Sequence, residues 1–99
     1  MERGGCVYIM SNKHHTTLYI GVSSDLKRRV WEHKTRIYPK SFTARYNCDK
    51  LVYYEVYSTI TEAIAFEKAL KSKSRAFKES LITKMNPEWK NLGDEVDKW

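Results

Sequence analysis

The chain has 99 residues, enough for one domain, and its 18 Lys and Arg against 12 Asp and Glu give a net charge of +6. This length excludes a two-domain enzyme and a barrel, so any chemistry must sit on one small core. No apolar run could cross a bilayer, and the N-terminus lacks the apolar segment of a signal peptide, which predicts a cytoplasmic protein. The basic excess predicts a polyanionic partner, of which nucleic acid is the commonest and an anionic membrane surface the rival.

The chain is expected to open with an antiparallel hairpin. Residues 6–11 and 17–22 are rich in β-branched and aromatic side chains, and the polar stretch between them has the length of a hairpin loop. His14 and His15 fall at its tip, where we expect a solvated loop and not a metal site, because no third ligand is near in sequence.

A first helix follows over about 25–36. Ser and Asp side chains at its start can cap it, and Leu26, Val30 and Ile37 form one apolar stripe at helical spacing. Residues 38–49 are basic and aromatic, and we expect them to be irregular.

A third strand and two more helices complete the predicted domain. The strand covers 50–57, a capping-box pattern precedes a helix over 62–73, and the last helix, over 75–85, has a Phe77, Leu81, Met85 stripe. The order β-β-α-β-α-α predicts a small α+β domain over 1–92 with a mostly antiparallel sheet. Residues 93–99 form an acidic tail that we expect to be peripheral.

Three polar residues lie within these apolar stripes. Glu67 falls among Ala63, Phe66 and Leu70, where a lone carboxylate is costly unless a cation pairs with it. His33 lies beside the stripe of the first helix, and the helical spacing turns Arg29 inward and Arg28 outward.

Two interpretations of these residues stay open. In one, Glu67 forms a structural ion pair, with Arg29 as a partner, and His33 is a satisfied core histidine. In the other, the three supply a cation ligand, a phosphate-binding guanidinium and a titratable group. The second set suits phosphodiester hydrolysis, which needs charge stabilisation and an activated water.

Six short motifs in order resemble the GIY-YIG nuclease family, in particular its small stand-alone bacterial branch. The resemblance covers about residues 6–92 and departs from the family pattern where Cys6-Val7 replaces Gly-Ile. The motifs are Cys6-Val7-Tyr8, Tyr19-Ile20-Gly21, Asp25 to Arg29 with His33, Leu51 to Glu55, Glu62-Ala63-Ile64 with Glu67, and Asn86 to Trp89.

The resemblance implies a three-stranded antiparallel sheet flanked by helices and metal-dependent endonuclease cleavage of nucleic acid, usually DNA, with DNA repair as one role. It implies that Glu67 binds Mg²⁺ or Mn²⁺, and that Arg29 stabilises the phosphate charge. By motif position the site residues are Tyr8, Tyr19, Arg29, His33, Glu67 and Asn86. Tyr8, Tyr19 and His33 all stay open as the general base, because an unperturbed tyrosine pKa of about 10 is high for that task.

Two basic clusters are candidates for binding nucleic acid with low sequence specificity, since basic side chains mixed with aromatics suit backbone contacts and base stacking. We expect a monomer or weak dimer, with a protein partner as an option. The alternative function is a nucleic-acid-binding module that has lost turnover. The candidate binding residues are Lys34, Arg36, Lys40, Arg45, Lys68, Lys71, Lys73, Arg75 and Lys78.

Overall fold

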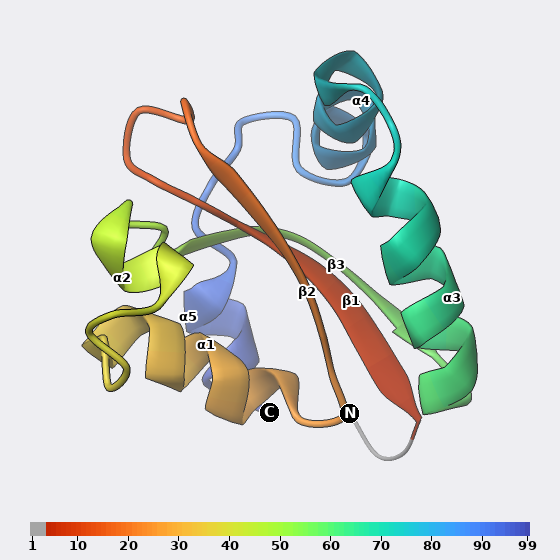
Figure 1. Ribbon diagram of the computed structural model, residues 1–99, viewed down its shortest axis with the longest axis horizontal. Helices are drawn as coiled ribbons and strands as arrows, with labels where there is room; N and C mark the ends of the chain where they lie inside the picture. The colour runs from red at the N-terminus through yellow and green to blue at the C-terminus, as the bar shows by residue number, and fades with distance from the viewer. Residues whose placement is uncertain (1–3) are drawn as a thin grey trace.

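The computed structural model describes residues 4–99. Its centre is a three-stranded antiparallel sheet with the strand order β2-β1-β3 (Figure 1). The strands are β1 (Gly5–Ser11), β2 (Leu18–Ser23) and β3 (Lys50–Tyr57). The predicted α+β class with a three-stranded antiparallel sheet is confirmed.

Helices cover both faces of this sheet (Figure 1). One face carries α1 (Leu26–Thr35), the short α2 (Phe42–Arg45) and α5 (Gly93–Val96), while the other carries α3 (Ile60–Lys71) and α4 (Arg75–Met85). The helix α3 packs on β1 and β2, whereas α4 packs on β3.

The central strand β1 is buried along its whole length and divides the core in two. Because successive side chains in a strand point to opposite faces, Tyr8 and Met10 enter the α1 side while Val7 and Ile9 enter the α3 side. The helices that follow begin at side-chain caps, with Asp25, Thr59 and Ser74 each accepting a backbone N–H bond from the first turn.

Two predicted apolar stripes are wrong in part. Ile37 lies just past the first helix, as expected, but its side chain is exposed after the left-handed C-cap Arg36 and does not continue the buried stripe of Leu26 and Val30. On α4 the fully buried residue is Ile82, whereas Phe77 and Met85 are exposed. The predicted residues of α4 share one side of the helix, but α4 has apolar residues on two sides. The sequence pattern alone therefore did not show which side packs on the sheet.

Two segments are more ordered than we expected. The stretch 38–49 contains α2, which is capped by Ser41. The C-terminal tail is not peripheral, because α5 packs against α1 and Val96 is fully buried in the same core cluster as Tyr8. Within the described residues, none of the helices has the length and apolar character that crossing a membrane requires.

The burial of Val96 predicts that the tail stabilises the domain. We expect Val96→Ala to lower the free energy of unfolding by about 2 kcal/mol, because it removes buried methyl groups and leaves a cavity. Glu95→Ala, at an exposed position of the same helix, is the control and should change stability little. Urea unfolding measures both, and equal midpoints for the two variants would contradict the packing role of α5.

Candidate active site

Two tyrosines and a histidine meet between the sheet and α1. The Tyr8 hydroxyl lies 2.9 Å from His33 Nε2, and both side chains are buried. The Tyr19 ring centroid is 5.5 Å from that of His33 and 6.4 Å from that of Tyr8. Gly21 pairs with Tyr8 across the sheet, and a Cβ at this glycine would collide with the Tyr8 ring and hydroxyl. The glycine of the second motif therefore makes room for the tyrosine of the first.

The other nitrogen of His33 is held by a residue that the sequence did not single out. His33 Nδ1 lies 2.8 Å from Thr43 Oγ1, and Thr43 is buried in the first turn of α2. Burial and the positive charge of Arg29 lower the His33 pKa to about 4. The imidazole is therefore neutral at pH 7, with one nitrogen able to donate and the other able to accept.

The Tyr8 hydroxyl stays protonated at neutral pH. Burial raises its pKa to about 12, and the nearby charge of Arg29 offsets only part of this rise. Loss of the Tyr8 proton therefore requires either a strong local positive charge or a partner that takes the proton. His33 Nε2 is the partner already within hydrogen-bond distance.

Arg29 is oriented by a buried carboxylate on its own helix. Its Nη1 lies 2.6 Å from Glu32 Oε1, and Arg28 Nε lies 3.2 Å from the other oxygen of the same group. The Arg28 side chain is 68% exposed against 33% for Arg29, which confirms that Arg29 faces inward. Glu32 was missed, although its spacing of three and four residues from the arginines is that of helical ion pairs.

Glu67 is largely buried, as its place in the stripe predicts. Its carboxylate pairs with Lys71 one turn later, at 2.9 Å, and not with Arg29 as the structural interpretation expected. In residues 4–99, no three His, Cys, Asp or Glu side chains come together as a metal cluster. Glu67 is therefore the carboxylate that would hold Mg²⁺ or Mn²⁺, cations that accept oxygen ligands and keep several waters.

A groove of about 300 Å³ runs along the edge strand β2 and joins these parts. The residues that line it are Leu18, Tyr19 and Ile20 of β2, Phe42 of α2, Lys71 of α3 and Lys78 of α4. Because Lys71 is the partner of Glu67, the carboxylate lies at the same edge of the sheet as Tyr19.

Asn86 does not join this cluster. It is buried beside β3, the edge of the sheet opposite to β2. Its Nδ2 donates to the carbonyl oxygens of Val52 and Lys90, and its Oδ1 accepts from the Lys90 N–H. All of these bonds hold the segment after α4 against the sheet.

The basic residues differ in what they already bind. Lys34 pairs with Asp97, Arg36 with Asp49, and Arg75 with Glu79. Arg75 also donates to the Thr16 carbonyl and so ties the hairpin loop to α4. Lys71 and Lys78 both line the groove, and Lys71 also pairs with Glu67.

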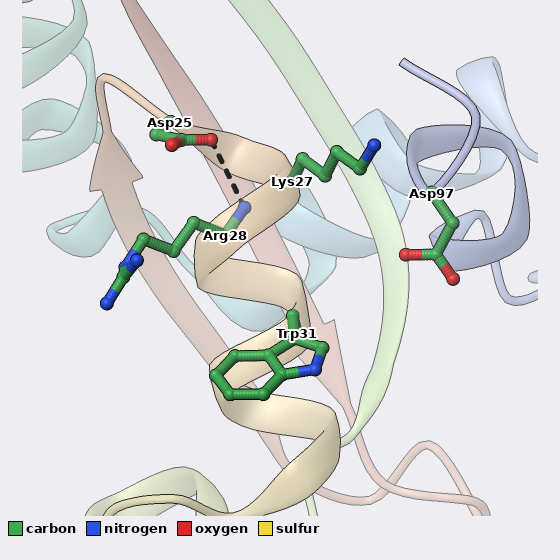
Figure 2. Close-up of a pocket in the computed structure, with 5 residues that line it drawn as sticks. All are labelled: Asp25, Lys27, Arg28, Trp31 and Asp97. Atoms are coloured by element: carbon green, nitrogen blue, oxygen red, sulfur yellow. Dashed lines mark hydrogen bonds between the residues drawn. The ribbon is translucent and has the colours of Figure 1, made fainter.

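A second hollow, of about 440 Å³, lies on the outer side of α1. Figure 2 shows Lys27 and Asp97 on one side of it and Arg28 pointing away on the other, with the Trp31 ring exposed below them. Its lining is two acids, two bases and one Trp, with neither tyrosine nor His33. The hollow therefore lies apart from the groups that could cleave a phosphodiester.

Comparisons with known proteins agree with this fold. Residues 4–80 match the model of the GIY-YIG catalytic domain, which is more than half of the chain. The fold is similar to the solution NMR structure of a UPF0213 protein from Bacillus halodurans, with 26% sequence identity and a TM-score of 0.56. The similarity covers 89% of this chain and 92% of that one. A search of curated proteins found no match.

The lowered pKa of His33 predicts a stability that depends on pH. The unfolded chain protonates His33 near pH 6.5, whereas the folded protein does so near pH 4. The contribution of neutral His33 to the free energy of unfolding is therefore complete above pH 6.5. It is lost as the pH falls toward 4, and the free energy of unfolding decreases by about 2 kcal/mol between pH 7 and pH 5. Urea unfolding at these two values measures the loss. His33→Gln, which does not titrate, should show a smaller loss; equal losses would contradict the assignment.

Proposed function

Because this chain belongs to the GIY-YIG catalytic domain family, we propose that it is a divalent-metal-dependent endonuclease that hydrolyses phosphodiester bonds in DNA. Family membership implies a nuclease-type function. The observation that carries the finer proposal is the buried Tyr8–His33 hydrogen bond beside Tyr19, a residue that also lines the groove with Lys71, the partner of Glu67. In the proposal, the Tyr8–His33 pair supplies a proton acceptor, Arg29 a guanidinium and Glu67 a cation ligand.

The charged groups have separate roles in this proposal. Arg29 stabilises the negative charge that develops on the phosphate during attack, since a fixed donor is worth most where charge forms. Glu67 is the protein ligand for the divalent cation. When bound, the cation supplies positive charge against the phosphate and makes water more acidic. Lys71 is then free to contact the nucleic-acid backbone.

The proton of the attacking water passes to the Tyr8–His33 pair. The tautomer with hydrogen on Nδ1 donates to Thr43 and leaves Nε2 free to accept from the Tyr8 hydroxyl. With the Tyr8 pKa raised and the His33 pKa lowered, neither is charged at neutral pH. We therefore assign His33 as the final acceptor and Tyr8 as the group that orients the water, or relays its proton.

One observation favours the second candidate, a nucleic-acid-binding module without turnover. The Glu67 carboxylate already has a cation, the Lys71 ammonium, at 2.9 Å. A module of this kind would bind DNA through the same groove and cleave nothing. Low sequence specificity, a cytoplasmic location and a role in DNA repair stay predictions under either function.

The metal ligand is tested by plasmid nicking with Mg²⁺ or Mn²⁺. We expect Glu67→Gln to lower the nicking rate by about 100-fold or more, because the charge that binds the ion is gone. Glu88→Gln is the matched control, since that side chain is 69% exposed and lies after α4, and it should cleave as the wild type does. Undiminished cleavage by Glu67→Gln, with or without EDTA, would contradict the proposal, and no cleavage by the wild type would favour the binding module.

The adjacent arginines of α1 provide a second test of the site. Arg29→Ala should lower the nicking rate by about 100-fold, while Arg28→Ala should change it by no more than a few-fold. Both variants keep one arginine on Glu32, so the buried carboxylate stays paired in each. Equal losses in the two variants would mean that general charge, and not the inward guanidinium, is what the reaction needs.

A further inference from the structure

A row of three aromatic rings leads away from the candidate active site, and the first two of them line the groove. The Tyr19 ring, which contacts His33, stacks on Phe42 with ring centroids 5.9 Å apart and planes 30° apart. The ring centroid of Phe42 in turn lies 4.6 Å from that of Tyr46. Phe42 and Tyr46 are 44% and 47% exposed, so about half of each side chain is open to solvent. We call Tyr19, Phe42 and Tyr46 the aromatic row.

The helix α2 builds the outer part of this row and fixes His33 at the same time. Ser41 caps α2, and the buried Thr43 contacts His33, while Phe42 and Tyr46 stay about half exposed. Phe42 and Tyr46 are four residues apart and so lie on the same side of one turn. Large aromatic side chains ordinarily contribute stability by being buried, so packing within the domain does not explain why Phe42 and Tyr46 are exposed.

Positive charges surround the row. Lys71 and Lys78 line the same groove as Tyr19 and Phe42, and the Arg45 guanidinium lies 5.9 Å from the centroid of the Tyr46 ring, over its face. The groove volume of about 300 Å³ is at the lower end for ligand pockets. A space of this size with ring faces and cations suits one nucleotide, since a base stacks on aromatic side chains while its phosphate meets the lysines.

We propose that the aromatic row binds an unpaired nucleobase beside the bond to be cut, which makes single-stranded DNA, or DNA with unpaired nucleotides, the substrate class. A base in a duplex has both faces covered by its neighbours, so only an unstacked base offers its face to the row. Extruding a paired base costs a few kcal/mol, and a single strand avoids that cost. Because Tyr19 belongs both to the row and to the tyrosine–histidine cluster, the bound base lies next to the scissile phosphate. This inference rests on the proposed nuclease function.

The test is a binding measurement that needs no cleavage. Fluorescence anisotropy in EDTA compares a labelled single-stranded DNA oligonucleotide with its duplex. We expect the wild type to bind the single strand about tenfold more tightly, and Phe42→Leu, which keeps apolar volume and loses the ring, to remove most of this preference. Phe42→Trp should retain it. These two variants separate the loss of stacking from a failure to fold, which circular dichroism checks independently.

Phe77 gives a closely matched control. It is also exposed, at 42%, and a lysine, Lys73, lies over its ring, but it is on α4 and outside the groove. Phe77→Leu should keep the single-strand preference. Equal wild-type affinity for the two DNA forms, or equal effects of Phe42→Leu and Phe77→Leu, would overturn the inference.

The outcomes also separate this inference from the nuclease proposal. A single-strand preference that depends on Phe42, in a protein that cleaves neither DNA form when metal is added, would contradict the nuclease function and retain the base-binding site. Metal-dependent cleavage without that preference would contradict the base-binding site alone.

Discussion

The hydrogen bond between the Tyr8 hydroxyl and His33 Nε2 connects the central strand to α1 and is the contact on which the site depends. Both groups are buried, so each would be left unsatisfied without the other, at a cost of about 1–3 kcal/mol. The bond also places a protonated hydroxyl against a neutral imidazole, because burial moves both pKa values away from the charged forms. The same contact therefore stabilises the fold and prepares a proton acceptor.

Residues on two other elements support this hydrogen bond. Gly21 on the neighbouring strand leaves the space that the Tyr8 ring fills, and Thr43 on α2 binds the far nitrogen of His33. The helix α2 has only four residues, too few to be stable alone. Its Ser41 cap and the buried Thr43 hold it in place. The position of the His33 ring therefore depends on α2, the helix that also carries Phe42.

The sequence predicted the positions that depend on one helix, and it missed contacts between residues on different elements. Helix periodicity placed Arg29 inward and Glu67 within an apolar stripe, because those positions depend on one helix alone. Thr43 was missed because its partner is ten residues away and on another element, and a four-residue helix has too few turns to show a period. Asn86 matched a family motif, yet its side chain binds backbone beside β3, which only the strand order of the sheet reveals.

The two ion pairs at the site differ in how easily they open, and this difference separates their roles. The Lys71 side chain pairs with Glu67 at the spacing of one helical turn and is 55% exposed, so its ammonium can turn away into solvent. In the proposed function, a divalent cation on Glu67 takes the place of this ammonium and leaves Lys71 available to a phosphate. The Glu32 carboxylate is buried and bound by two arginines, so removing its partners would leave an uncompensated charge. In the proposed function, Arg29 therefore keeps a fixed guanidinium for the charge on the phosphate, while Lys71 changes partners when Glu67 binds the cation.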